Sequence, residues 1–328
     1  YEIVTGDWSS NVCSSDLKSV QLGSGLEKTG KLSRDSMNRT IQALKVCKQK
    51  LDKYDVKYSR LIATEACRRA KNSKDFILKV FQETDLKLNI IDTEEEARLA
   101  VISCAPLVSS KSEQLLVVDI GGGSTELVWI DLSAVPSHER PKSIMRLHSG
   151  FHSIESPFPA ARVVDWISVP LGVATLRDQF NDVEDDAARF ALMSWYFEEK
   201  LTDFAPYKDN KIDTSFQIIG TSGTVTTVAS SHLGLRRYDR TKVDGLRMTT
   251  DQIDKVIRSY LEMGPDGRKK DPRIGRDRQA LIMSGSAILQ AMLRSWPTDK
   301  LTVADRGLRE GLLYAQMSAN GVLEDVIL

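Results

Sequence analysis

The stretch VVDIGGGSTEL, residues 117–127, decides the fold. The apolar run at 115–118 predicts a buried strand that ends at Asp119, and 125–132 predicts a second strand directly after the turn. The glycines at 121–123 let the backbone approach an anion closely, and their N–H groups can form a nest for phosphate. The alternative for a D-x-G-G-G run is a strained turn that binds nothing.

A second turn of the same composition follows later in the chain, in IIGTSGTVTT at 218–227, and a helix is expected after it. We predict that both turns donate hydrogen bonds to phosphate. The residues are Gly121, Gly122, Gly123, Ser124 and Thr125 in the first turn, and Gly220, Ser222, Gly223 and Thr224 in the second. Asp119 is placed at a strand end to hold Mg²⁺, directly or through water.

Neither turn is a common nucleotide-binding motif. No G-K-[ST] follows, which excludes a P-loop, and a strand rather than a helix follows GGGST, which excludes a dinucleotide fingerprint.

Strands and helices alternate elsewhere, so the 328 residues predict an α/β fold of two domains. Helices are expected at 32–51, 73–85, 94–105, 185–201, 224–233 and 278–296, and strands at 87–92, 113–120, 125–132 and 215–220. The connection at 131–163 has no clear period and is expected to be a loop insertion.

The composition excludes several classes of protein. Lys plus Arg equals Asp plus Glu, 45 against 45, so no net field selects nucleic acid or an anionic membrane. The four cysteines form no C-x-x-C pair and no zinc spacing, which favours a reduced, cytoplasmic protein. The apolar runs are too short to span a bilayer, and no signal-peptide pattern is visible. We expect a cytoplasmic protein without a nucleic-acid or membrane partner.

Eight short motifs occur in an order that resembles one enzyme family. They are LGSGLEKTGKLS (22–33), ATEACRRA (63–70), EEEARLA (94–100), VVDIGGGSTELV (117–128), VPLGVATL (169–176), IGTSGT (219–224), RDRQALIMSGSAIL (276–289) and DRGLREGLL (305–313). The chain resembles the exopolyphosphatase/guanosine-pentaphosphate phosphohydrolase (Ppx/GppA) family, within the actin/hexokinase/Hsp70 superfamily. The resemblance covers the chain from about residue 20 to its end, in the short form of the family without an added C-terminal phosphohydrolase-like domain.

The resemblance implies an α/β fold of the actin-like ATPase (ribonuclease H-like) type, duplicated into two domains around a cleft. On this basis domain I is expected at 18–125 and domain II at 126–305, with the C-terminal helix at 306–328 able to pack back on domain I. The implied reaction is Mg²⁺-dependent hydrolysis of the terminal phosphoanhydride of inorganic polyphosphate or of guanosine pentaphosphate (pppGpp). A homodimer is the family-level expectation.

The resemblance also implies roles for single residues. Glu96 matches the general base that activates water, and Glu126 matches a second carboxylate near the metal and the water. Arg68 matches the arginine that reaches the transferring phosphoryl group, and Arg278 falls in a position that faces the cleft side. The basic run at 267–278 could steer a polyphosphate tail. The alternatives are a solvated strand residue for Glu126 and a solvated loop for residues 268–270.

The segment GDWSSNVCSSDL, residues 6–17, has no apolar period and stands where the family has a first hairpin with a D-x-G-[ST]-N-S phosphate loop. Its letters resemble a translated sequencing adapter. We therefore expect residues 1–17 to be non-native and the chain as written to be impaired. Two other functions remain open at this point: a catalytically silent (p)ppGpp-binding regulator and a sugar-kinase-like phosphotransferase.

Overall fold

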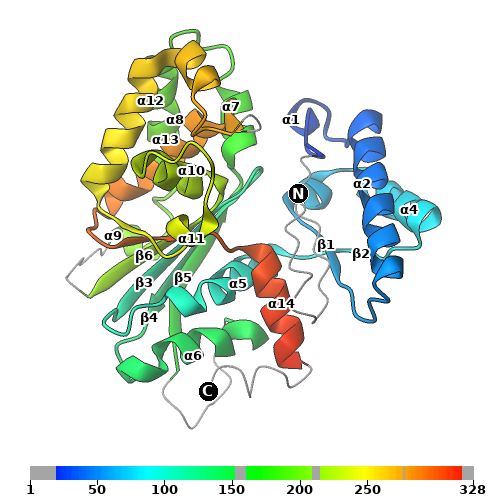
Figure 1. The fold of residues 1–328 in the computed structure, drawn as a ribbon, viewed down its shortest axis with the longest axis horizontal. Helices are drawn as coiled ribbons and strands as arrows, with labels where there is room; N and C mark the ends of the chain where they lie inside the picture. The colour runs from blue at the N-terminus through cyan, green and yellow to red at the C-terminus, as the bar shows by residue number, and fades with distance from the viewer. Residues whose placement is uncertain (1–19, 152–159, 209–214, 276–277, 320–328) are drawn as a thin grey trace. The chain divides into compact units, whose positions relative to one another are not determined.

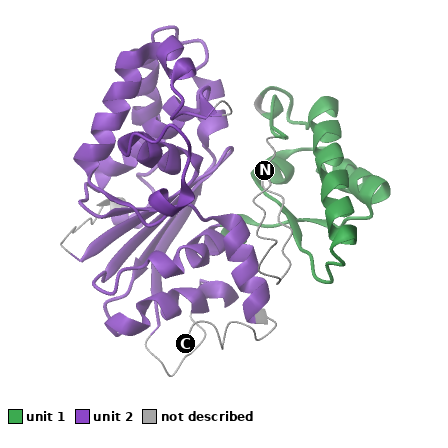
Figure 2. Cartoon of the chain, viewed as in Figure 1, with its two compact units in different colours: residues 1–96 green, residues 97–328 purple. Residues whose placement is uncertain are grey.

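The computed structural model describes residues 20–151, 160–208, 215–275 and 278–319. The segment expected to be non-native, 1–17, lies outside the described residues. The chain forms two compact units, unit 1 (Tyr1–Glu96) and unit 2 (Ala97–Leu328), shown in Figure 2. Among the described residues, none of the helices has the length and apolarity that a membrane crossing requires.

Unit 1 is a small helical layer on a short parallel pair of strands. Its elements are α1 (Leu26–Thr29), α2 (Arg34–Lys53), β1 (Leu61–Ala63), α3 (Glu65–Arg69), α4 (Ser73–Thr84) and β2 (Leu88–Ile90), followed by the start of α5 (Thr93–Ser103). Ser33 caps α2 by accepting a hydrogen bond from the Ser36 N–H, as its position before an apolar helical pattern predicts. Leu44, Phe76 and Val80 are buried between the helices and form part of the core.

Unit 2 is built on a six-stranded sheet of order β5-β4-β3-β6-β8-β7 (Figure 1). The strands are β3 (Gln114–Ile120), β4 (Thr125–Asp131), β5 (Arg162–Val169), β6 (Phe216–Thr221), β7 (Arg247–Met248) and β8 (Leu301–Ala304). β3 and β4 form the antiparallel hairpin that VVDIGGGSTEL predicts, and β6 lies parallel to β3 on its other side. Because β3 and β6 are parallel neighbours, their carboxyl ends lie side by side, and the turns that follow them begin at the same end of the sheet.

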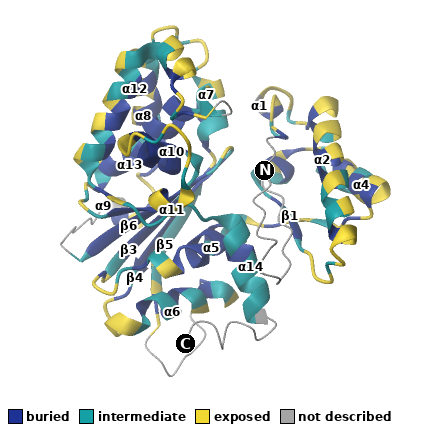
Figure 3. Ribbon diagram, viewed as in Figure 1, coloured by how far each residue is buried: buried dark blue, intermediate teal, exposed yellow. Residues whose placement is uncertain are grey.

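Helices cover both faces of this sheet. α7 (Val173–Gln179), α8 (Asp186–Glu199), α10 (Gly223–His232), α12 (Thr250–Lys270) and α13 (Ile282–Ser295) lie on one face, and α5, α6 (Arg140–Met145) and α14 (Leu308–Ala319) on the other (Figure 1). Two shorter helices are α9 (Ala205–Lys208) and α11 (Arg240–Val243). Leu116, Val118 and Leu127 point from the sheet into the larger core, which Figure 3 shows as buried. Because side chains alternate along a strand, Asp119 and Glu126 face the opposite side.

The structure divides the chain at a different place from the expected domain boundary. The division expected between 125 and 126 falls inside the β3–β4 hairpin, in which Ile120 pairs with Thr125. The compact units separate at Glu96 and Ala97 instead, within α5. The physical reason is that β3 and β4 are paired along their whole length, so the two strands belong to the same unit.

Two other expectations need correction. The connection at 131–163 contains α6 with 3-10 turns at Ser137–Glu139 and Arg146–Ser149, where burial of Ile144 compensates for the missing apolar period. The start of the basic run belongs to the end of α12 rather than to a solvated loop. There the Arg268 guanidinium is buried, 2.8 Å from both carboxylate oxygens of Asp186.

Candidate active site

The first glycine turn is closed by a hydrogen bond from the Gly121 N–H to the Ser124 carbonyl, 2.9 Å. In the part of the chain that the structure describes, the N–H groups of Gly122, Gly123 and Ser124 donate to no protein acceptor. Gly123 is half-buried and Ser124 is buried, whereas Gly122 is exposed. N–H groups that are shielded from water need a partner, and a bound anion can supply one. The Thr125 hydroxyl differs from the expectation, because it donates to the Leu171 carbonyl at 2.8 Å and is buried.

The second glycine turn uses its own side chain to satisfy its backbone. The Ser222 hydroxyl accepts hydrogen bonds from the N–H groups of Thr224 and Val225, both at 3.1 Å, and so caps α10. Gly220 does not belong to the turn, since it lies inside β6 and pairs with β3 and β8 on its two sides. Its missing side chain lets Val225 pack on the strand, which corrects its expected role as a phosphate donor.

The two turns form the walls of one cavity of about 100 Å³ in unit 2. It is lined by Ile120, Gly121, Gly122, Val173, Gly223, Thr224, Arg278, Leu281 and Ile282. The Arg278 guanidinium lies directly on Gly223, where any side chain would overlap it. The second turn was expected to act from the opposite domain. Instead both turns lie in the same unit, because β3 and β6 are neighbouring parallel strands.

A row of polar residues crosses the sheet on the face opposite the larger core. Ser168 of β5, Glu126 of β4, Asp119 of β3 and Thr221 of β6 are successive register partners. The Ser168 hydroxyl donates to Glu126 Oε1 at 2.8 Å, and Glu126 is 2% exposed. Glu126 is therefore not the solvated strand residue of the alternative interpretation. Directly opposed residues share a face, so the carboxylates of Asp119 and Glu126 are neighbours.

These two carboxylates fit Mg²⁺, which is held in proteins by one or two carboxylates together with waters and substrate phosphates. In the described ranges there is no group of three or more His, Cys, Asp or Glu side chains that could hold a metal by itself. A cation at this place would therefore need oxygen ligands from water or a substrate as well as from these two carboxylates.

The charged residues of unit 1 form a compact acid–base cluster. Arg68 Nη2 lies 2.6 Å from Glu96 Oε2 and 3.0 Å from Glu65 Oε2, and Arg68 Nη1 donates to the Ile91 carbonyl at 3.0 Å. The side chains of Arg68 and Glu96 are 15% and 11% exposed. Arg68, expected to reach a phosphoryl group, is engaged here by two carboxylates of its own unit.

Burial sets the titration of this cluster. Burial raises the pKa of Glu96, and so does the repulsion between Glu96 and Glu65. Together they outweigh the effect of Arg68, whose positive charge lowers this pKa. Burial acts to lower the pKa of Arg68, but the attraction of Glu96 and Glu65 prevails and the pKa is raised. A carboxylate with a raised pKa is a stronger proton acceptor than an ordinary glutamate, which is what a general base requires.

Glu65 and Ser168 contact candidate residues and were not singled out from the sequence. Glu65 has a local signal, because it stands three residues before Arg68 and such pairs meet on a helix. Ser168 has none, since it reaches Glu126 only through the pairing of β4 with β5.

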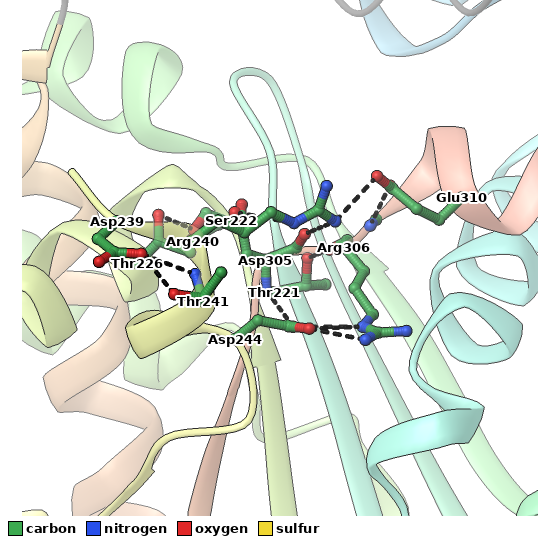
Figure 4. A network of polar contacts seen from close by, with 11 residues as sticks. Thr221, Ser222, Thr226, Asp239, Arg240, Thr241, Asp244, Asp305, Arg306 and Glu310 are labelled. Carbon is green, nitrogen blue, oxygen red and sulfur yellow. Dashed lines mark hydrogen bonds and ion pairs between the residues drawn. The ribbon is translucent and has the colours of Figure 1, made fainter. Parts of the chain in front are cut away.

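A second polar network holds the ends of β6 and β8 together (Figure 4). The Thr221 hydroxyl donates to the Arg306 carbonyl, and the Arg306 guanidinium contacts Asp244, with Nη2 and Oδ2 2.7 Å apart. Asp244 also accepts from the Asp305 N–H at 3.0 Å, and hydrogen bonding to Asp244 raises the pKa of Arg306. The DRGLREG motif thus fixes the start of the second glycine turn.

Known proteins resemble this chain along most of its length. The Ppx/GppA phosphatase family model matches residues 3–320. The bifunctional 3-dehydroquinate synthase/phosphatase of Fusobacterium nucleatum subsp. nucleatum is 26% identical over 310 residues, which are 88% of this chain and 40% of that protein. The guanosine-5'-triphosphate,3'-diphosphate pyrophosphatase of Aeromonas salmonicida is 26% identical over 303 residues, 92% of this chain and 54% of that protein. The chain spans about half, or less, of the length of these curated relatives.

A solved structure supports the same relationship. The crystal structure of the Aquifex aeolicus Ppx/GppA family member has a TM-score of 0.69 and 30% sequence identity, and covers 92% of this chain and 87% of its own. The predicted actin-like ATPase type of α/β fold is confirmed by these relatives. The family match and the shared structure lead to one conclusion: the chain belongs to the Ppx/GppA phosphatase family.

Proposed function

We propose that this protein removes the terminal phosphoryl group of inorganic polyphosphate or of pppGpp by hydrolysis. The observation that carries the proposal is the cavity of unit 2, which has glycine-turn backbone on two sides and the Arg278 guanidinium beside it. Backbone N–H groups and a guanidinium bind phosphate oxygens without contacting a base or sugar. This fits both substrates, because they present the same terminal anhydride.

The N–H groups of Gly122, Gly123 and Ser124 and the guanidinium of Arg278 would neutralise the charge of the bound phosphates. Asp119 and Glu126 would hold Mg²⁺, which would supply further neutralisation of the phosphate charge. Phosphoryl transfer requires positioning and charge neutralisation more than covalent chemistry from the protein. The buried Ser168–Glu126 hydrogen bond supports this assignment, because it orients the carboxylate in advance.

Glu96 is the proposed general base. Its buried position and raised pKa suit a group that accepts a proton from the attacking water. Arg68, held by Glu65 and Glu96, would keep the carboxylate in one orientation. A phosphoryl group that reaches Arg68 would compete with these carboxylates for its planar fork.

The test is phosphate release from polyphosphate and from pppGpp, each offered separately with Mg²⁺. We expect release from at least one substrate by a version with the first hairpin restored, slower release by the chain as written, and loss of release when Glu96→Gln is made in the restored version. Glu94→Gln is the matched control, because Glu94 lies in the same first turn of α5 and should leave the rate unchanged. Binding of pppGpp without any release would instead favour the regulator, and ATP-dependent phosphorylation of a sugar would favour the kinase.

A further inference from the structure

The segment Gly172–Thr175, which begins α7, lies against the back of the first glycine turn. The Val173 N–H donates to the Gly121 carbonyl at 2.9 Å, and the Ala174 N–H donates to the Gly122 carbonyl at 2.9 Å. These bonds join segments about fifty residues apart in the sequence. Their donors are the first N–H groups of a helix, which have no partner within the helix itself.

The third carbonyl of the turn is reached by a side chain. The Thr175 hydroxyl lies 3.2 Å from the Gly123 carbonyl and accepts a hydrogen bond from the Gly172 N–H at 2.7 Å. The carbonyls of all three glycines in the turn therefore face Gly172–Thr175. The same hydroxyl is also 3.2 Å from the Gly172 carbonyl, so its single proton serves one of the two acceptors at a time.

Position 172 requires glycine because its backbone lies so close to Gly121 and Gly122, and not because of its φ and ψ angles. Its φ of −114° and ψ of −173° are extended values that any residue adopts. A Cβ atom at this position, however, would overlap the carbonyls of Gly121 and Gly122. The close approach of the two backbones is therefore possible only with glycine here.

The segment is itself fixed from the other side. The Ser284 hydroxyl of α13 donates to the Val173 carbonyl at 2.6 Å, and Leu176 is fully buried below it. The first turn of α7 cannot shift without disturbing α13, so it can act as a rigid support for the glycine turn.

The contacts to the three glycine carbonyls fix the orientation of the peptide groups in the turn. They therefore determine where the N–H groups of the same peptide groups point. In a planar trans peptide the C=O of one residue and the N–H of the next point in opposite directions. Because the carbonyls of Gly121, Gly122 and Gly123 face Gly172–Thr175, the N–H groups of the following residues face away from it. These are the N–H groups that have no protein acceptor within the described residues.

We propose that Gly172–Thr175 is a positioning segment for the first glycine turn, which aims the N–H groups of Gly122, Gly123 and Ser124 at a phosphate bound on the side of the turn that faces away from α7. The proposal rests on the proposed function, because it assumes that this turn binds phosphate. It adds a role for the VPLGVATL motif, whose residues Gly172–Thr175 contact the turn.

The experiment measures binding of inorganic pyrophosphate to protein labelled with ¹⁵N-glycine. The amide signals of Gly122 and Gly123, assigned by their loss in Gly122→Ala and Gly123→Ala, should shift as pyrophosphate is added. Thr175→Val should weaken binding roughly fivefold, which corresponds to one net hydrogen bond. Thr175→Ser should restore the wild-type affinity. Gly172→Ala should weaken binding at least tenfold, about 1.4 kcal/mol.

Thr202→Val is the matched control, since the Thr202 hydroxyl also donates to a backbone carbonyl three residues earlier in unit 2 but lies far along the chain from the turn. Its affinity should equal that of the wild type. A merely structural role for Thr175 would lower the melting temperature while leaving the dissociation constant unchanged. Equal binding by wild type and Thr175→Val would overturn the positioning proposal. No shift in the wild type would overturn phosphate binding by the first glycine turn, and with it the proposed function.

Discussion

Unit 1 and unit 2 handle charge in different ways. In unit 1 a single guanidinium nitrogen of Arg68 lies within 3.0 Å of two carboxylates, so the cluster consists of charged side chains that hold one another. In unit 2 the cavity is lined by glycines of both turns, by aliphatic side chains and by Arg278, and the first turn is held by hydrogen bonds to its carbonyls. The difference teaches that unit 1 suits proton transfer, which needs a tuned pKa, whereas unit 2 suits binding, which needs fixed donors.

Glu96→Gln tests the chemical side of this comparison and should have the largest effect. Loss of a general base lowers kcat by about 10²–10⁴-fold. The KM should change little, because the substitution removes a proton acceptor and leaves every proposed phosphate-binding group in place. Steady-state kinetics of phosphate release measure both constants. A large rise in KM with unchanged kcat would show that unit 1 binds substrate, contrary to the comparison.

Asp186→Asn tests how much the buried ion pair between Arg268 and Asp186 contributes to the free energy of unfolding. The substitution leaves Arg268 buried beside an uncharged partner and should cost about 3 kcal/mol of unfolding free energy. Burial would raise the pKa of Asp186, but Arg268 and Arg189 lower it below its ordinary value. The folded state thus binds its proton more weakly than the unfolded state, so the stabilisation is present at neutral pH and is lost as the pH falls through the folded pKa.

Urea unfolding at about pH 7 and about pH 3 measures this effect, and the difference between wild type and Asp186→Asn should shrink at the lower pH. Lys269→Met is the comparison variant, because Lys269 pairs with Asp266 within α12 and the two side chains are 69% and 90% exposed. Its loss should cost less than about 1 kcal/mol. An equal cost for both variants would contradict the distinction between the buried and the local pair.

Arg278→Ala tests the binding side of the comparison. Removing the guanidinium beside the second glycine turn should raise KM roughly tenfold to a hundredfold, since hydrogen bonds to charged groups contribute about 1.5–3 kcal/mol. The kcat should change less than the KM. Arg236→Ala, an exposed arginine of the same unit, is the control, and its KM should match that of the wild type. An unchanged KM in Arg278→Ala would remove this arginine from the binding site.

Glu65→Gln should have the smallest effect of these substitutions, and that effect should be on the pH dependence of kcat. Glu65 repels Glu96 and shares Arg68 with it, so its neutralisation should lower the pKa of Glu96. The acid limb of the kcat profile should therefore move to lower pH, while kcat on the plateau stays close to the wild-type value. A pH–rate profile measures the shift, and movement to higher pH would contradict the role given to Glu65.

The sequence predicts the elements well where the signal is local. The apolar run before Asp119, the glycines after it and the Ser33 cap each identify a strand, a turn and a helix start, and the structure confirms them. α6 was missed because its burial comes from a few residues, such as Ile144, without a repeating period. Arg268 was assigned either to a basic run that steers polyphosphate or to a solvated loop, because nothing in the sequence near it reveals that Asp186 lies opposite.

The sequence by itself determined the fold class, the family and the two glycine turns, because strand and helix periods, glycine content and ordered motifs are properties of short segments. Only the tertiary structure decided that both turns line one cavity, that Glu126 is buried against Ser168, and that Gly172–Thr175 supports the first turn. These facts depend on strand order, register and close backbone contact between segments far apart in the chain. Pairing of that kind is fixed by the whole core, and no single segment carries a signal for it.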